Sequence, residues 1–163
     1  MHPLATLPLL AALVLQAASP VASLQSAPAK DKKASVTYLF PEQVTLPAGK
    51  PSPVDLHFKV EEGLHINSHQ PHAEELIPTT LSLPENAEVR LASVTFPPGQ
   101  DFSFAINPKE KLNVYTGEFT VHATFVAPKG EHLVQGTLHY QACNNAACFP
   151  PHTIPVVFDV IAK

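Results

Sequence analysis

Tryptophan is absent from this 163-residue chain, and charged residues are scarce. The missing tryptophan excludes an antibody-type core packed around a central Trp. Charged residues make up 15% of the chain, whereas about 25% is usual in globular proteins. This low fraction argues against a disordered acidic or basic tail. Ten Lys and Arg stand against fourteen Asp and Glu, for a net charge of -4 without a basic stripe. Nucleic-acid binding is therefore not expected.

Glycine is also scarce, with 6 residues against 18 prolines. Because proline is excluded from helix interiors, long helices are not expected beyond the first thirty residues or so. The length suits one domain and is short of two. With 45% hydrophobic residues, that domain can bury a core of its own.

The beginning of the chain has the pattern of an export signal. Residues 4–18 are uncharged and consist mostly of Leu, Ala and Val, a stretch too short to span a membrane. Small residues at 21–23 offer a cleavage site. An uncleaved anchor or a buried helix is the alternative. We predict a signal peptide over 1–23, a flexible leader over 24–34 and a folded domain over 35–163. A periplasmic or secreted location follows, where two thiols tend to pair.

The remaining sequence is typical of short β-strands. Residues 54–60 (VDLHFKV) alternate strictly between apolar and polar, which is the period of a half-buried strand. Similar β-rich runs occupy 35–40, 89–96, 119–126, 133–140 and 154–160. Pro- and Gly-rich turn signals separate these runs. We predict an all-β fold, a two-sheet antiparallel sandwich.

Two cysteines, Cys143 and Cys148, enclose only four residues. A pair this near can be bridged across a tight turn if its Cα atoms come within bridging distance. The chain-entropy model gives so small a loop about 2 kcal/mol, against nearly 5 for a hundred-residue loop. Such a bridge is a reasonable redox candidate. A non-catalytic β-sandwich interaction module, in which this hairpin disulfide is purely structural, is equally open, because the spacing differs from the C-x-x-C redox motif.

The segments around the cysteines carry a family resemblance. Residues 140–143 (YQAC), followed by 148–151 (CFPP), resemble the N-terminal periplasmic domain of the thiol:disulfide interchange protein DsbD. Three upstream segments fit in the expected order: 63–67 (GLHIN), 76–81 (LIPTTL) and 114–117 (VYTG). The resemblance covers roughly Ser35 to Lys163, and the cysteine block is its most specific part.

The resemblance implies an immunoglobulin-like fold and a redox function without a bound cofactor. The cysteine pair would cycle between dithiol and disulfide, as a component of protein-disulfide reduction. It would take reducing equivalents from a thioredoxin-like or membrane-embedded donor and pass them to oxidised periplasmic acceptor proteins. Cys143 and Cys148 then take the redox roles, and we expect Cys143, the first of the pair, to form the mixed disulfide.

Further site residues follow from the same resemblance. A loop with an aromatic side chain caps the pair in the family, and residues 101–104 (DFSF) match it here. The expected cap group is therefore Asp101, Phe102 and Phe104, with Phe102 favoured over Phe104 and a plain core role as its alternative. His65 and Asn67 replace aromatic side chains near the site, and Tyr140 opens the cysteine block.

The sequence also departs from the family pattern. The pair of the best-known member encloses five residues, not four. The membrane and thioredoxin domains that accompany this domain in the family do not follow before Lys163. We therefore expect the redox partner to be a separate protein.

A histidine cluster supplies a third hypothesis, a metal carrier. His65, His69 and His72 lie within eight residues, and imidazoles bind zinc and copper. Pro71 interrupts any helix that would align them. We expect instead a polar strand end that runs into a loop, with the histidines solvated or hydrogen-bonded. Hydrolysis and phosphate binding find no support, since neither G-x-S-x-G nor a glycine-rich phosphate loop occurs.

Overall fold

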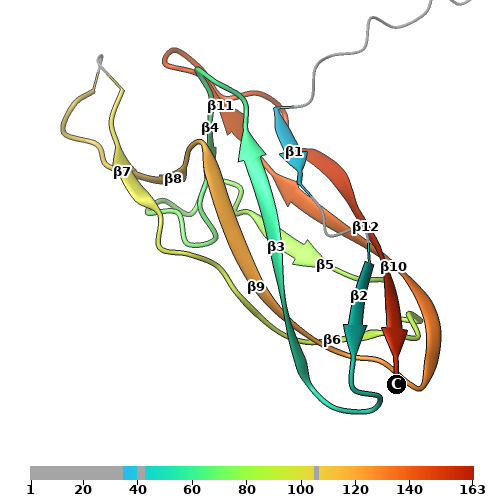
Figure 1. Ribbon diagram of the computed structural model, residues 1–163. Helices are drawn as coiled ribbons and strands as arrows, with labels where there is room; N and C mark the ends of the chain where they lie inside the picture. The colour runs from blue at the N-terminus through green and yellow to red at the C-terminus, as the bar shows by residue number, and fades with distance from the viewer. Residues whose placement is uncertain (1–34, 40–42, 105–106) are drawn as a thin grey trace, which may run out of the picture. The chain divides into compact units, whose positions relative to one another are not determined.

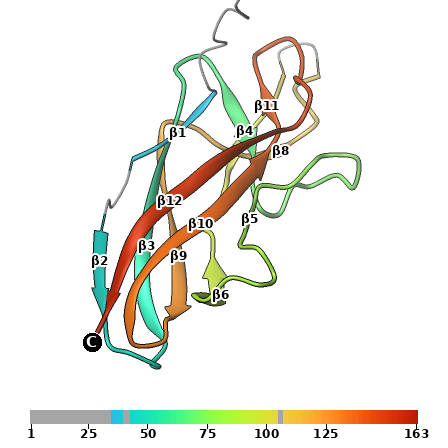
Figure 2. The ribbon, with the colours of Figure 1, turned by 90° about the vertical axis from the view of Figure 1, so that its right-hand side faces the viewer.

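The computed structural model describes residues 35–39, 43–104 and 107–163. All of them belong to one compact unit, Lys33–Lys163, which Figures 1 and 2 show from two sides. The expected signal peptide and leader lie outside the described residues. Within the described part, no helix is long and apolar enough to cross a membrane.

The described residues form strands joined by turns. The strands are β1 (Val36–Tyr38), β2 (Gln43–Leu46), β3 (Ser52–Val60), β4 (His65–Asn67), β5 (Thr80–Ser82), β6 (Arg90–Thr95), β7 (Gln100–Phe102), β8 (Leu112–Tyr115), β9 (Glu118–Val126), β10 (Gly130–Tyr140), β11 (Ala142–Cys143) and β12 (His152–Ala162). The six runs predicted from the alternating pattern correspond to β1, β3, β6, β9, β10 and β12, as far as the described residues reach. The all-β prediction is confirmed.

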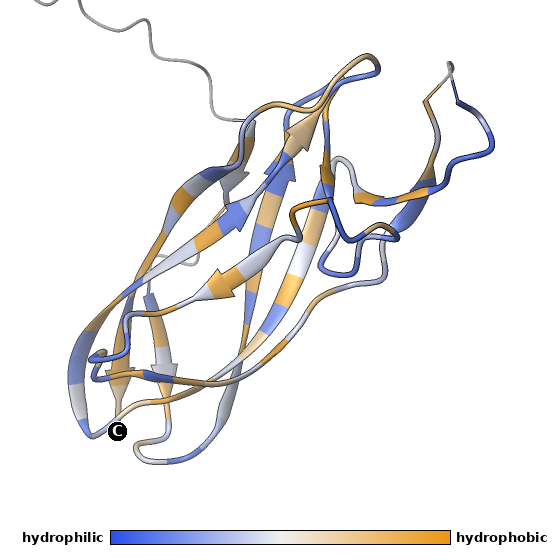
Figure 3. Cartoon of the chain, turned by 180° about the vertical axis from the view of Figure 1, so that it is seen from behind, coloured by the Kyte–Doolittle hydropathy of each residue, from blue (hydrophilic) through white to orange (hydrophobic). Residues whose placement is uncertain are grey.

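Two four-stranded sheets share one hydrophobic core. The first has the order β1-β3-β9-β6 and the second β2-β12-β10-β5. Every second residue of β3 is buried, and the long strands alternate in hydropathy as Figure 3 shows. Leu56 and Phe58 of β3 are fully buried. Burial of each such side chain contributes about 1.5–3 kcal/mol, so the alternating faces hold the β-sandwich together.

A third sheet, in the order β11-β4-β8-β7, lies at the end of the unit away from the C-terminus (Figure 1). It continues from the sandwich, because β11 follows β10 after a single residue. Three of its strands carry the residues in question: β11 ends with Cys143, β4 begins with His65 and β7 ends with Phe102. This third sheet therefore positions the residues singled out from the sequence.

Two features differ from the predicted two-sheet antiparallel sandwich. Hydrogen bonding groups the strands into three sheets, and β2 pairs with β12 in parallel. The first two strands belong to different sheets, because β1 pairs with β3 and β2 pairs with β12. The missed strands have two to four residues, too few for a two-residue period to stand out in the sequence.

Candidate functional site

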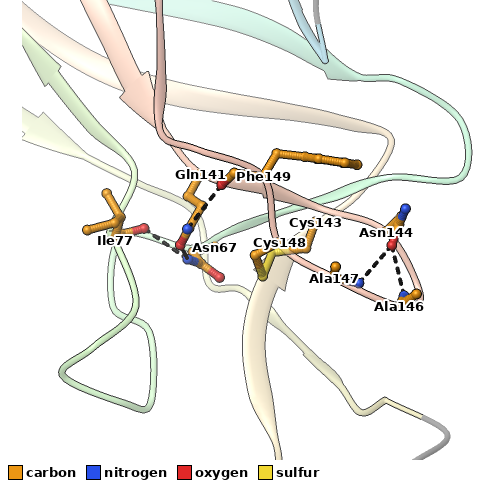
Figure 4. Close-up of a disulfide and its surroundings, with 9 residues drawn as sticks. All are labelled: Asn67, Ile77, Gln141, Cys143, Asn144, Ala146, Ala147, Cys148 and Phe149. Atoms are coloured by element: carbon orange, nitrogen blue, oxygen red, sulfur yellow. Dashed lines mark hydrogen bonds between the residues drawn. A yellow bond between two sulfur atoms is a disulfide. The ribbon is translucent and has the colours of Figure 1, made fainter.

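Cys143 and Cys148 are joined by a disulfide bond, with their Cα atoms 3.9 Å apart. Cys143 ends β11, and Cys148 faces it in an isolated antiparallel bridge. Figure 4 shows the two sulfurs at the neck of the loop that carries the four intervening residues. The expected pairing of the two thiols is confirmed.

The two half-cystines differ in exposure. Cys143 is 0% exposed, whereas Cys148 is exposed. An incoming thiolate must reach the sulfur it attacks, so a partner protein can reach Cys148 and not Cys143. The expectation that Cys143 forms the mixed disulfide stays a prediction, although Cys148 is the exposed member of the pair. The difference in exposure follows from position: Cys143 lies within the third sheet, while Cys148 is on the outer return of the loop.

Asn144 organises the four-residue loop between the cysteines. Its side-chain Oδ1 accepts hydrogen bonds from the backbone N–H groups of Ala146 at 2.8 Å and Ala147 at 2.9 Å. Its own N–H donates to the Ala147 carbonyl at 2.9 Å. Asn favours such turns because its side chain bonds to the backbone just ahead of it. The loop is thus closed by hydrogen bonds as well as by the sulfur bond.

A buried amide ties both ends of this loop to β4. The Asn67 side chain is 0% exposed, and its Nδ2 donates to the Ile77 carbonyl at 3.0 Å and to Gln141 Oε1 at 3.1 Å. Gln141 Nε2 in turn donates to the Phe149 carbonyl at 3.2 Å (Figure 4). The Phe149 N–H donates to the Ala142 carbonyl at 2.8 Å. These bonds involve neither sulfur, so they can persist when the disulfide opens.

His65 lies directly opposite Cys143 in the antiparallel pair of β4 and β11. It is 2% exposed, and its Nε2 is buried without a hydrogen-bond partner in the described part of the chain. Burial lowers the pKa of His65 below its ordinary value of 6.5, because desolvation disfavours the charged imidazolium. The expectation of a solvated or hydrogen-bonded histidine is wrong here. The strand that carries it is enclosed by its neighbours in the third sheet.

Two phenylalanines close over His65. The Phe102 ring lies 4.0 Å from the His65 ring between centroids, and the Phe104 ring lies 6.0 Å away. The two phenylalanines meet edge to face at 5.4 Å. Phe102 is half-buried and Asp101 is exposed. The structure thus brings Phe102 against the residue opposite Cys143, while the capping role itself remains a prediction.

Gly99 lets the segment before β7 approach its neighbours. A Cβ atom at this position would come within 2.9 Å of the Ser68 Cβ and would overlap the Asn113 side chain. Real Cβ atoms do not make contacts that close. The absence of a side chain at Gly99 therefore allows β7, and with it Phe102, to pack where it does.

Tyr140 serves the core. It is 0% exposed within the main hydrophobic cluster, and its hydroxyl shares a hydrogen bond of 3.0 Å with Ser35 Oγ. Its ring lies 6.0 Å from that of His152. Tyr140, the first residue of the cysteine block, therefore packs in the hydrophobic core.

The other two clustered histidines bind backbone carbonyls. His69 Nδ1 is 3.0 Å from the Thr79 carbonyl oxygen, and its ring stacks on Phe96 at 4.4 Å. His72 Nδ1 is 3.1 Å from the Lys111 carbonyl oxygen. Among residues 35–39, 43–104 and 107–163, no three His, Cys, Asp or Glu side chains are grouped so as to hold a metal ion. The structure does not bring His65, His69 and His72 together as ligands.

Sequence reasoning missed the roles of Gln141 and Asn144. Gln141 lies inside the block that carried the resemblance, but its contact with Asn67 depends on the pairing of two very short strands. Asn144 had a usable signal, because an Asn directly after a half-cystine in a short loop is a turn former.

The family model for the N-terminal part of the thiol:disulfide interchange protein DsbD matches residues 29–158. No curated protein sequence matches the chain. Similar solved structures include the DsbD N-terminal domain of Neisseria meningitidis in the reduced form, at TM-score 0.45 and 18% identity over 68% of this chain and 79% of that chain. A PapD-like domain of human CEP192 matches at TM-score 0.42 and 13% identity, over 88% of this chain and 98% of that one. Since the family model spans well over half of the sequence, the chain belongs to the DsbD N-terminal domain family.

Proposed function

We propose that this chain is a thiol–disulfide exchange module of the periplasm, with an immunoglobulin-like sandwich as its scaffold. The observation that carries the proposal is the asymmetric pair: an exposed Cys148 bonded to a fully buried Cys143. Such a pair offers one sulfur to a partner and keeps the other as an internal leaving group. Membership of the DsbD N-terminal domain family supports the same function.

In the reducing direction, a donor thiolate attacks the Cys148 sulfur and the Cys143–Cys148 bond breaks. Cys143 leaves with the electron pair of that bond and takes up a proton. A second donor thiol then attacks the donor sulfur of the mixed disulfide, which releases Cys148 as a thiol and the donor as a disulfide. The donor is a thioredoxin-like or membrane-embedded thiol–disulfide domain.

In the delivering direction, the Cys148 thiolate attacks an oxidised acceptor protein, and Cys143 then resolves the mixed disulfide. Two electrons pass to the acceptor, which leaves as a dithiol, and the Cys143–Cys148 bond forms again. The reaction is that of a protein-disulfide reductase component. The pair carries the electrons itself, so the exchange requires no bound cofactor.

Phe102 shields one side of the pair in this proposal. Its ring covers His65, which faces Cys143, so the apolar side of the pair is closed to small solutes. A thioredoxin-like partner docks on the open side of the pair, where Cys148 is exposed. Asp101 and Phe104 flank Phe102 and complete the cap.

Trapping tests the proposal directly. Cys143→Ser removes the resolving thiol, so Cys148 is expected to accumulate in mixed disulfides with its partners in the exported compartment. Cys148→Ser is the matched control, since it leaves only the buried thiol and is expected to trap little. Mass spectrometry of the disulfide-linked species identifies donor and acceptor. Equal trapping by both variants, or by neither, rejects the proposed roles.

A structural disulfide predicts a different response to reductant. Thioredoxin is expected to reduce the oxidised domain, and the domain is expected to stay folded because a loop this small contributes only about 2 kcal/mol. Thermal unfolding of the oxidised and reduced forms measures that difference. If thioredoxin leaves the bond intact, or if its reduction unfolds the domain, the pair is a structural disulfide.

A further inference from the structure

The residue that faces Cys143 across the strand pair is a histidine. In an antiparallel pair, directly opposite residues project on the same side, with Cβ atoms about 4.5–5.5 Å apart. Cys143 and His65 are such partners in the β4–β11 register. Both side chains are almost completely buried, at 0% and 2% exposure. The imidazole and the Cys143 sulfur are therefore expected on the same side of the strand pair, in a space shielded from solvent.

Exchange requires Cys143 to lose a proton inside that space. Resolution of the mixed disulfide needs the Cys143 thiolate, and burial in apolar surroundings disfavours a thiolate. The sequence supplies no Asp, Glu, Lys or Arg between Glu131 and Asp159. The flanks of the cysteine loop offer only His139 on β10 and His152 on β12 as neutral bases, and both lie outside the β4–β11 pair.

We propose that His65 accepts the proton of the Cys143 thiol as Cys143 attacks the mixed disulfide on Cys148; the inference rests on the exchange function proposed above. The His65 Nε2 is buried and has no hydrogen-bond partner in the described residues, so in the tautomer with the proton on Nδ1 its lone pair is free to receive a proton. The Phe102 ring, 4.0 Å away, holds one face of the imidazole and keeps water out.

The protonation state of His65 fits this role. Burial lowers its pKa, so the imidazole is neutral near neutral pH and can act as a base. A histidine that was already charged in the resting protein would have no free lone pair to offer.

Rival proton acceptors are placed less well. The titratable and charged groups on the elements packed against β4 are Cys143 on β11, Cys148 after it, Tyr115 on β8, Asp101 on β7 and Lys111 just before β8. The Tyr115 hydroxyl donates to the Pro97 carbonyl at 3.0 Å and accepts from the His69 N–H at 3.1 Å. Asp101 and Lys111 are exposed. His65 is the buried base among them.

The proposed step balances. The Cys143 S–H proton moves to His65 Nε2, and the Cys143 thiolate attacks the Cys148 sulfur. The bond between Cys148 and the acceptor sulfur breaks, and the acceptor leaves with that electron pair. The imidazolium then releases its proton to the departing thiolate or to water, which restores neutral His65. The protein dithiol is oxidised by two electrons and the acceptor disulfide is reduced.

The aromatic disulfide dithionitrobenzoate separates the two cysteines in one experiment. Attack by the exposed Cys148 releases the first coloured thiolate, and resolution by Cys143 releases the second. His65→Phe keeps a ring against Phe102 but removes the base, and His65→Gln removes both. We expect the second release to slow about 10²-fold in each variant, as for loss of a general base, with the first release unchanged. The half-buried His139, changed to Gln, is the matched control.

The pH profile adds an independent readout. In the wild-type protein the rate of the second release is expected to level off once His65 is neutral. In His65→Phe the rate of the second release is expected to keep rising with pH, because only hydroxide then deprotonates the thiol. Circular dichroism confirms that each variant is folded before it is compared.

The possible failures are distinct. A wild-type protein that releases no second thiolate refutes the exchange function itself. If both releases occur and the second is as fast in His65→Phe as in the wild type, the exchange function stands and the inference about His65 is wrong. Slowing of both releases equally in the two folded variants also overturns it, because His65 would then only shape access to Cys148.

Discussion

The Asn67 side-chain amide donates a hydrogen bond to Gln141 Oε1 at 3.1 Å and so connects β4 to the residue just before β11. Gln141 passes the connection on to the Phe149 carbonyl, beyond the second cysteine. Both ends of the cysteine loop are therefore anchored to the same buried strand. This anchoring explains how the loop can keep its place while the sulfur bond between its ends opens and closes.

Asn67→Ala tests this anchor. The substitution leaves the Ile77 carbonyl and Gln141 Oε1 without their donor inside the protein. Because a buried polar group left unsatisfied costs about 1–3 kcal/mol, we expect the free energy of unfolding to fall by that amount. Urea unfolding measures it. Asn86→Ala, at an exposed position, is the control, and an equal effect of the two substitutions would show that the anchor contributes nothing.

The turn between the cysteines offers a matched pair of neighbours. Asn144 accepts two backbone hydrogen bonds, whereas Asn145 is exposed at the tip. A side chain that satisfies backbone N–H groups contributes about 1 kcal/mol, so Asn144→Ala is expected to loosen the loop and Asn145→Ala is not. Hydrogen exchange at the Ala146 and Ala147 amides reports this. The interpretation fails if both variants exchange at the wild-type rate.

Much of the fold could be predicted because it depends on long, regular patterns. β3 alternates over nine residues, and the period survives in the sequence. The third sheet is different, because β4 and β11 have three and two residues and their pairing depends on contacts between distant segments. No local pattern reveals that Cys143 is buried and Cys148 exposed. That asymmetry arises only when β4, with His65, packs beside β11, so the sequence alone does not show which cysteine faces a partner.

The cap prediction can be tested by comparing two rings. Phe102 lies 4.0 Å from the His65 ring, whereas Phe104 lies 6.0 Å away and meets Phe102 by an edge. An aromatic contact of this kind contributes about 0.5–1.5 kcal/mol to holding the cap in place. Because Phe102→Ala removes that contribution, we expect it to speed reduction by dithiothreitol up to about tenfold. Phe104→Ala is expected to have a smaller effect. Stopped-flow reduction kinetics measure both, and a larger effect of Phe104→Ala would transfer the capping role to that residue.

Two histidines give stability opposite dependences on pH. The side-chain hydrogen bond from His132 Nδ1 to Glu88, 2.9 Å long, raises the pKa of His132 above 6.5, with further support from the Pro128 carbonyl. The stabilisation by His132 is thus fully present below pH 6.5 and is lost as pH rises through the raised pKa. Glu88→Gln is expected to remove most of it. The effect is small and salt-sensitive, because the Glu88 side chain is 77% exposed.

His65 acts in the other direction, because burial lowers its pKa and the unfolded chain binds the proton more readily. Its contribution is present above pH 6.5 and is lost as pH falls through the unfolded value towards the lowered one. Urea unfolding of wild type and His65→Phe between about pH 5 and 8 separates this effect from that of His132, which both proteins retain. We expect the wild type to lose stability relative to His65→Phe as the solution becomes acidic. A stability difference that is constant over this range would mean that His65 is not held neutral, and it would remove the free lone pair on which its role as proton acceptor depends.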